Sequence, residues 1–450
     1  MWTALLLLAC RQTPDDPGAS PDTPTAPSPT AHTADSGRTH DSGTSPGLCQ
    51  ATDHPLRFIC PGTGTFSWWP EGEPERTRTT EASGEALIWG VPADTPVIVE
   101  LPSGERTTVT PGSLPVRVGA MFATTSGTAS TRALALPNPC DGQDLLVVDD
   151  LGRIIWYQEF QAPVAAIATT PDDTFLVLIG NGRFLEIDLA GHDILNVTGF
   201  SRPLHHDLAR DDAGNTYLLY ADEFTHDSVD YVLDGLIVLD RAGTPIAEWD
   251  LRDHLDPSIL FPDDRGLYWD QRFPGAVDFS HGNSVEVAPD GGVTLSFRWM
   301  HAAMHLRGDP TSPDFGEVEW VLASPQSDLP SDFDLVGDDP TFDGQHHVSV
   351  DDAGRVWLYD NGDPEDVSRG LRYQLDGDRA TVDASWALPQ RCAIQGAVYP
   401  TDDDGALLTC SQAGSVREYG PADTDPRWSM DLTCAIGPRR LLNRAVPVPF

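Results

Sequence analysis

The chain has 450 residues, a formal net charge of −41 at pH 7 and 28 basic residues, all of which are arginine. The absence of lysine excludes a Schiff-base lysine, a P-loop lysine and a lysine general base. The acidic excess argues against nucleic acid or an anionic membrane surface as a partner, because both require a dense cationic surface. An anionic substrate would need a local pocket of arginine and histidine.

Residues 1–10 end in Leu-Leu-Ala-Cys, a pattern typical of a lipoprotein export signal. The segment is too short to span a bilayer, which takes about 20 apolar residues. In such a signal the cysteine is lipidated, so Cys10 is the predicted anchor and the only predicted link to a membrane. A chance apolar N-terminus is the alternative. Residues 11–48 are nearly all Pro, Ser, Thr, Asp, Gly and Ala, which predicts a disordered linker.

Six cysteines follow the predicted anchor: Cys49, Cys60, Cys140, Cys392, Cys410 and Cys434. None of them forms a Cys-x-x-Cys motif, which disfavours a zinc knuckle or a thioredoxin-type site. An even number in an exported chain favours disulfides. Cys49 with Cys60, and two of the three C-terminal cysteines with each other, are plausible pairs, and the sequence leaves the connectivity open. We therefore expect an exported protein in the bacterial periplasm or at the cell surface.

Short segments with alternating apolar residues, broken by Gly and Pro, fill residues 49–125 and predict a small β-sandwich. Over 126–450, runs of aliphatic and aromatic residues lie between Asp/Gly turns, as at 212–214 and 352–354. Hairpins that recur about every 40–50 residues are typical of a β-propeller, and this length holds about six blades. The predicted fold is all-β, with a six-bladed β-propeller after the sandwich. The irregular stretch 221–280 has the length to wall a binding site.

Five of the 13 histidines stand just before a strand that leads into an Asp/Gly turn. His206 and His346 each precede the glycine of their turn by eight residues. Asn283 has the same offset in a third segment, with His281 two residues earlier. Equivalent offsets in different blades map to equivalent radial positions, so we expect these side chains to converge on one mouth of the channel. Hairpin pairing should bring Arg298 beside His281.

Convergent imidazoles allow metal ligation, acid–base catalysis, or nucleophilic catalysis through a phosphorylated or sulfated imidazole. Metal ligation is the strongest rival, because neutral imidazole is the commonest metal ligand. Arg298 argues against a metal, since a fixed cation is unfavourable beside a dication. A guanidinium is well suited to the oxyanion of a sulfate or phosphate.

Three motifs occur in a fixed order. His-His-Asp (205–207) stands ahead of a Gly-Asn turn, and Asp-Phe-x-His-x-Asn-Ser (278–284) has an arginine 17 residues after its histidine. Gln-His (345–346) precedes a turn and a strand that ends in Tyr-Asp-Asn-Gly (359–362). Together they resemble the bacterial arylsulfate sulfotransferases over roughly residues 126–450. The resemblance implies a six-bladed propeller that moves a sulfuryl group from an aryl sulfate donor to a phenol acceptor, without a nucleotide donor or other cofactor.

The resemblance also implies a ping-pong path in which His346 attacks sulfur to form a sulfohistidine. His281 and Arg298 would hold the sulfuryl oxygens. His206, or its neighbour His205, would complete the cluster and assist proton transfer at the phenolic oxygen. Positioned cations and hydrogen-bond donors are what the spread negative charge of the transferred group requires.

Two alternatives stay open: a non-catalytic propeller that binds a ligand or partner protein at the same mouth, and a histidine-ligated metal site. One position also departs from the family. His347 stands where those enzymes usually carry a small hydroxyl residue. Strand alternation predicts that its side chain points away from His346 and the channel.

Overall fold

The computed structural model describes residues 48–260, 266, 268–363, 366–435, 437, 439 and 441–448. In this part of the chain, strands and short 3₁₀ turns form seven sheets with mostly antiparallel pairing. The all-β prediction is confirmed. None of the described segments is a helix with the length and apolar character to cross a membrane. The predicted signal 1–10, with Cys10, and residues 11–47 of the predicted linker lie outside the described residues.

The first sheet lies within the segment predicted as a sandwich. Its strands are β1 (Gln50–Ala51), β2 (Phe58–Pro70), β3 (Arg78–Ile88), β4 (Val97–Glu100) and β5 (Arg106–Val109). The order is β1-β2-β4-β5, with β3 also paired to β2, because the 13 residues of β2 are enough for several partners. All five strands therefore belong to one sheet, and the two-layer packing stays a prediction.

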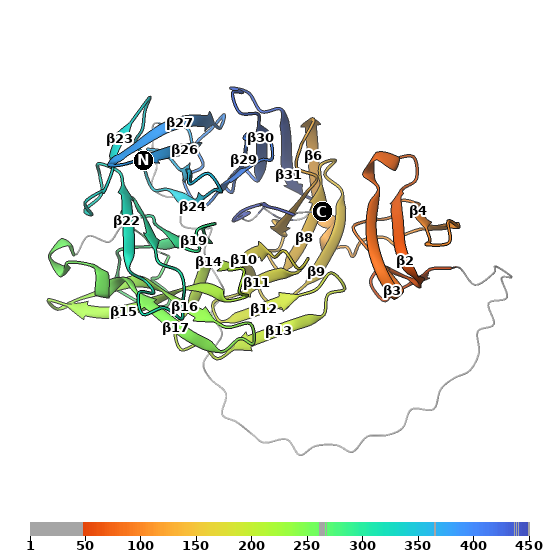
Figure 1. The fold of residues 1–450 in the computed structure, drawn as a ribbon, viewed down its shortest axis with the longest axis horizontal. Helices are drawn as coiled ribbons and strands as arrows, with labels where there is room; N and C mark the ends of the chain where they lie inside the picture. The colour runs from red at the N-terminus through yellow and green to blue at the C-terminus, as the bar shows by residue number, and fades with distance from the viewer. Residues whose placement is uncertain are drawn as a thin grey trace, which may run out of the picture. The chain divides into compact units, whose positions relative to one another are not determined.

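Six further sheets follow along the chain (Figure 1). The first two are β32 (Val446–Pro447), β7 (Ala133–Pro137), β8 (Asp144–Asp149) and β9 (Ile154–Glu159), then β10 (Val164–Thr169), β11 (Phe175–Ile179), β12 (Arg183–Ile187) and β13 (Asp193–Thr198). The next two are β14 (Leu204–Arg210), β15 (Thr216–His226), β16 (Val229–Leu239) and β17 (Pro245–Asp250) with β18 (Val277–Asp278), then β19 (Gly282–Val287), β20 (Val293–Phe297), β21 (Ala302–Leu306) and β22 (Val318–Ala323). The last two are β24 (His346–Val350), β25 (Val356–Asp360), β26 (Arg369–Asp376) and β27 (Arg379–Ala387) with β23 (Asp334–Val336), then β28 (Ala397–Pro400), β29 (Ala406–Cys410), β30 (Ser415–Tyr419) and β31 (Trp428–Cys434) with β6 (Met121–Gly127).

These sheets have the up-and-down strand order of propeller blades, with apolar side chains packed between neighbouring sheets. The propeller-like architecture is confirmed. The number of blades stays a prediction, with which the six sheets agree.

The Asp/Gly repeats form the tight turns between the first two strands of several sheets. The Asp351 carboxylate accepts hydrogen bonds from the backbone N–H groups of residues 353 and 355. Gly354 then adopts φ 74°, in the left-handed region that glycine occupies without strain. Asp211 and Gly214 repeat this arrangement between β14 and β15. Each turn reverses the chain within a few residues, so the strand before it stays next to the strand after it.

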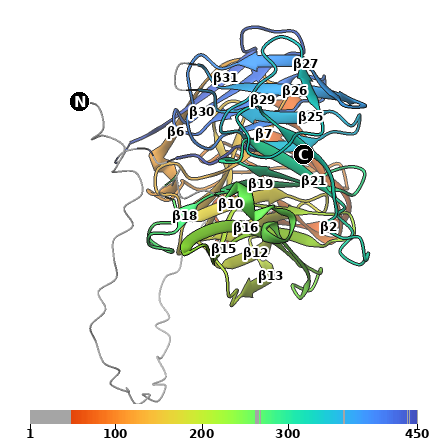
Figure 2. The same cartoon turned by 90° about the vertical axis from the view of Figure 1, so that its left-hand side faces the viewer.

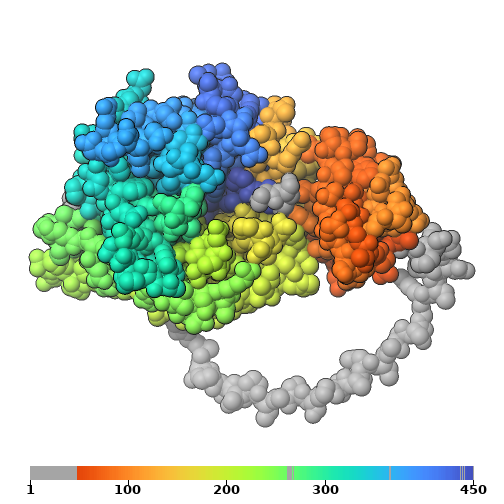
Figure 3. Space-filling view, viewed as in Figure 1, coloured from red at the N-terminus to blue at the C-terminus, as the bar shows by residue number. Residues whose placement is uncertain are grey.

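Two strands join sheets that are far from them in sequence. β6 pairs with β31 of the last sheet, and β32 pairs with β7 of the first (Figures 1 and 2). β6 therefore crosses the predicted domain boundary between residues 125 and 126. The space-filling view shows the atoms of the last sheet packed against those near β6 (Figure 3). The Cys140–Cys434 disulfide joins the same two regions.

The other two disulfides are Cys49–Cys60 and Cys392–Cys410, and both are pairs that we considered plausible from the sequence. Three disulfides favour an oxidising compartment outside the cytosol.

Candidate active site

The predicted site residues lie where the innermost strands of three neighbouring sheets begin. β14 and β24 each show a register shift beside the histidine pair, and β19 shows one just after His281. At these points His206, His281 and His347 adopt φ values of 52°, 51° and 46°. Left-handed backbone is costly for residues other than glycine and clusters at functional sites. These register shifts change the direction of the side chains at the start of each strand.

His346 is oriented by the side chain of Asn361, the residue after β25. The Asn361 amide nitrogen donates to the backbone carbonyls of residues 392 and 395, so its oxygen faces His346. His346 Nδ1 lies 2.6 Å from that oxygen. Because a carbonyl oxygen only accepts, Nδ1 must carry the proton, and the Nε2 atom keeps its lone pair.

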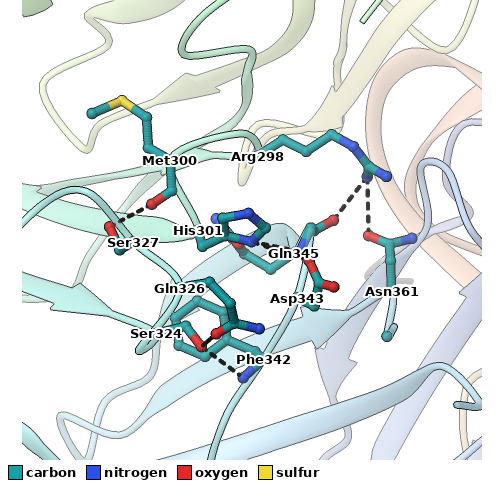
Figure 4. Close-up of polar contacts among 12 residues, drawn as sticks. Arg298, Met300, His301, Ser324, Gln326, Ser327, Phe342, Asp343, Gln345 and Asn361 are labelled. Carbon is teal, nitrogen blue, oxygen red and sulfur yellow. Dashed lines mark hydrogen bonds and ion pairs between the residues drawn. The ribbon is translucent and has the colours of Figure 1, made fainter. Parts of the chain in front are cut away.

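Arg298 is the residue after β20, and its side chain extends to Asn361 (Figure 4). Its guanidinium donates to the backbone carbonyls of Gly344 at 2.8 Å and Ala393 at 2.7 Å. Its Nη1 also lies 3.0 Å from His346 Nδ1, but because Nδ1 donates to the closer Asn361 oxygen, Nη1 donates to the Gly344 carbonyl and to Asn361 Oδ1 instead. Burial lowers the pKa of Arg298 to about 10, so it is a cation at neutral pH. The site therefore holds a fixed positive charge beside a neutral imidazole.

His281 is held through its Nδ1 atom, which lies 2.7 Å from Asp278 Oδ2. The ring packs against Trp299, with ring centroids 5.5 Å apart, and Trp299 also lies under the Arg298 guanidinium. The carboxylate fixes a proton on Nδ1 and leaves the lone pair of the ring on Nε2.

The structure separates the roles of the two histidines on β14. His206 meets His281, with ring centroids 4.9 Å apart, whereas His205 lies behind His206. His205 Nδ1 lies 2.8 Å from His206 Nδ1, and His205 Nε2 lies 3.0 Å from Asp234 Oδ1. His206 is therefore the member of the pair that faces the cluster.

The structure brings His206, His281, Arg298 and His346 together, with exposed fractions of 8, 7, 7 and 4%. Among the described residues, the Nε2 atoms of His206, His281 and His346 have no hydrogen-bond partner. All three atoms keep some exposure to solvent. Burial holds the pKa of His346 and of His206 well below the usual range. Arg298 adds to this effect at His346, and His281 adds to it at His206. The cluster thus offers three imidazole nitrogens next to one guanidinium.

Tyr268 is a neighbour of the site that we did not single out from the sequence. It comes from the stretch 221–280 and contacts both His206 and His281, with centroid distances of 4.6 and 5.3 Å. Its side chain is 44% exposed, so it also borders solvent. An aromatic ring at this place suits a planar substrate.

The prediction that His347 points away from the channel is wrong. His347 Nε2 lies 3.0 Å from Glu286 of β19, and the ring contacts Tyr399 of β28. Arg444 and Asp207 complete this buried group, 2.9 Å apart. Alternation fails because the register shift between residues 346 and 348 puts two successive side chains on the channel side. Side chains from four sheets, together with Arg444 from the segment before β32, therefore form this polar group.

Asp234 escaped the sequence analysis, because it lies on β16, a different strand from His205, and no repeat spacing connects them. Asp278 opens the 278–284 motif, but the sequence did not identify it as the partner of His281. The segment 301–305 is a turn followed by strand β21. His301 Nδ1 lies 3.1 Å from the Asp343 carboxylate and accepts from the N–H of Gly344, whose carbonyl holds Arg298. Its role is structural.

A comparison with protein families matches the part of the chain that contains most of these residues. The family model described as Arylsulfotransferase (ASST) matches residues 129–413. No curated protein matches the chain. Among solved structures, a protein of unknown function from Bacteroides caccae is 10% identical, with a TM-score of 0.46 over 71% of this chain and 99% of that one. A streptogramin B lyase is also 10% identical, with a TM-score of 0.38 over 71% of this chain and 100% of that one.

Proposed function

The chain belongs to the arylsulfotransferase family, and from this premise we propose that it moves a sulfuryl group from an aryl sulfate ester to a phenol through a sulfohistidine on His346. The observation that carries the proposal is the fixed Asn361 amide, which leaves the lone pair of His346 on Nε2. A neutral imidazole with a directed lone pair is a competent nucleophile.

In the first step, His346 Nε2 attacks the sulfur of the donor, and the bond from sulfur to the aryl oxygen breaks. The aryl oxide leaves with the electron pair of that bond. The sulfuryl group bears negative charge on its oxygens, which the Arg298 cation and the His281 ring stabilise. The Arg298 Nε atom has no hydrogen-bond partner in the part of the chain that the structure describes, so it is available to a sulfuryl oxygen.

In the second step, the oxygen of an acceptor phenol attacks the same sulfur. The bond between sulfur and Nε2 breaks, and its electron pair returns to His346. His206 stands on the other side of His281 and accepts the phenolic proton. The donor and acceptor thus use one site in turn, which is the ping-pong sequence.

The experiment that tests this function is peptide mass spectrometry after incubation with an aryl sulfate and no phenol. We expect a peptide that contains His346 to gain the mass of one SO₃ group and to lose it when a phenol is added. A matched sample with the free phenol in place of the ester should show no adduct. A stable adduct on another residue, or none while phenol-dependent transfer proceeds, would contradict the proposal.

The Cys392–Cys410 disulfide should support the reaction, because it fixes the segment whose carbonyls orient Asn361 and Arg298. In a variant with both cysteines replaced by serine, we expect donor cleavage to slow by about tenfold to a hundredfold, since small displacements of reacting groups are costly. Enzyme assays together with circular dichroism would measure this. The matched double variant of Cys49 and Cys60 should keep the parent rate; an equal loss in both variants would refute the role.

We also propose that the protein is exported and held at a membrane by a lipid on Cys10. The three disulfides support export. Replacing Cys10 by serine should release the protein into the soluble fraction.

A further inference from the structure

Asp234 stands at the inner end of a line of polar side chains that leads to the candidate site. It lies on β16 and is buried, with Oδ1 3.0 Å from His205 Nε2. His205 is completely buried, and its other nitrogen lies 2.8 Å from His206 Nδ1. Both atoms are buried, and apart from this close ion-pair approach neither has a hydrogen-bond partner among the described residues. The line therefore runs from a carboxylate through two imidazoles to the histidine cluster.

The partners of Asp234 determine where the protons of this line reside. Its other oxygen accepts hydrogen bonds from the Ser280 hydroxyl and the Gly282 N–H. Burial alone would raise the pKa of Asp234, but His205, Ser280 and Gly282 together hold it below the usual range, so the group is an anion. A carboxylate oxygen only accepts, so the Nε2 of His205 must carry the proton.

The tautomer of His206 follows from that of His205. With its proton on Nε2, His205 presents a lone pair on Nδ1 to His206. His206 must then donate from its own Nδ1, and its Nε2 keeps a lone pair. Among the residues that the structure describes, those that face His206 are His205, His281 and Tyr268, with His346 and Arg444 acting at longer range. None of these is an anion that could stabilise a proton gained by His206.

We propose that Asp234 acts through His205 as a positioning residue that makes His206 the base for the acceptor phenol, a role that rests on the proposed sulfuryl transfer. As the phenolic oxygen bonds to sulfur, the proton moves from that oxygen to His206 Nε2. The bond between sulfur and His346 Nε2 breaks at the same time, and its electron pair stays on His346. The positive charge then spreads over the two imidazoles of β14 and is balanced by Asp234, which stays ionised. Solvent later removes the proton.

The cation next to the site explains why such a distant carboxylate matters. A protonated His206 would stand in a buried cluster that already contains Arg298 and would be strongly disfavoured. The carboxylate is the compensating charge, and it stands behind His205, away from the sulfuryl group that it would otherwise repel. Asp234 therefore stabilises the proton on His206, while Arg298 separately holds the anionic sulfuryl group.

The test compares acceptors of different acidity in the Asp234→Asn variant. An amide cannot offer two accepting oxygens, so it disturbs the tautomer of His205 while it keeps the shape of the side chain. We expect transfer to a phenol with a pKa of about 10 to fall about a hundredfold, the scale of general base catalysis. Transfer to a nitrophenol that is already ionised should fall less than about threefold, because no proton has to be removed. Release of the first aryl product from the donor should keep the parent rate.

Asp230→Asn is the matched control, because Asp230 is exposed on the same strand. It should leave both acceptors unaffected. If Asp234→Asn does not fold, His205→Gln interrupts the same line without touching Gly282 and should show the same dependence on the acceptor. If a folded variant loses transfer equally to both acceptors, or loses none, the inference about Asp234 is overturned, but sulfuryl transfer by the parent is not. A parent that transfers no sulfuryl group would overturn both proposals.

Discussion

In the His346→Ala variant we expect sulfuryl transfer to fall by at least about a thousandfold, because both half-reactions pass through the Nε2 atom that this substitution removes. Arg298 and His281 would still bind the donor, so its affinity should change far less than the turnover rate. Steady-state assays with a chromogenic aryl sulfate and a phenol give both quantities. The same variant should lose the SO₃ adduct.

Two further measurements sharpen this prediction. His192→Ala is the matched control, because His192 is an exposed histidine in the turn between β12 and β13 that pairs with Asp188, and it should keep the parent rate. Imidazole added to His346→Ala should restore part of the donor cleavage, since a free imidazole can replace the missing nucleophile. A variant that transfers sulfate as fast as the parent would refute His346 as the nucleophile.

Repeat spacing was enough to find the residues that meet at the candidate site. His206, Asn283 and His346 share one offset from their turns, and the structure places all three at the starts of neighbouring innermost strands. The reasoning works because each sheet is built the same way, so equal offsets become equal positions around the ring. Arg298 followed from hairpin pairing: its backbone N–H bonds to the carbonyl of His281.

The groups that orient these residues did not follow from the sequence. Asp234 acts from a different strand than His205, and a repeat pattern carries no information on contacts between unlike positions. His347 was placed on the wrong side because alternation assumes a regular strand, and the left-handed backbone at this residue breaks it. The irregular backbone is what brings successive side chains to the channel.

The net charge of the chain likewise did not predict the charge at the site. A formal charge of −41 argues against large polyanions, yet the structure concentrates Arg298 and Arg444 near the axis where the innermost strands meet. Composition describes the surface as a whole, whereas binding of one sulfate ester depends on a few groups at the site.

Arg444 leads to the largest effect that we expect on stability. It is 3% exposed, lies 2.9 Å from the Asp207 carboxylate, and donates to the backbone carbonyl of Asn283. Replacing it with methionine leaves Asp207 buried without its cation, so we expect the free energy of unfolding to fall by about 3–5 kcal/mol. Denaturant unfolding measures this loss. Arg241→Met, which removes a cation from an exposed pair with Asp172, should cost less than about 1 kcal/mol.

The pH dependence of the Arg444→Met variant separates the lost charge from lost packing. Burial raises the pKa of Asp207 to about 7 in the parent, and Arg444 opposes the rise, so the pKa should be higher still in the variant. When the pKa of a carboxyl group is higher in the folded than in the unfolded state, the free energy of unfolding falls as the pH rises above the unfolded pKa. The reason is that the unfolded chain loses the proton more easily. Parent and variant bind different numbers of protons only above the parent pKa of about 7, so the deficit relative to the parent should be smaller at about pH 6 than at about pH 9. Adding Asp207→Asn should recover part of the loss at the higher pH; a deficit that is independent of both pH and Asp207 would show that Arg444 acts through packing alone.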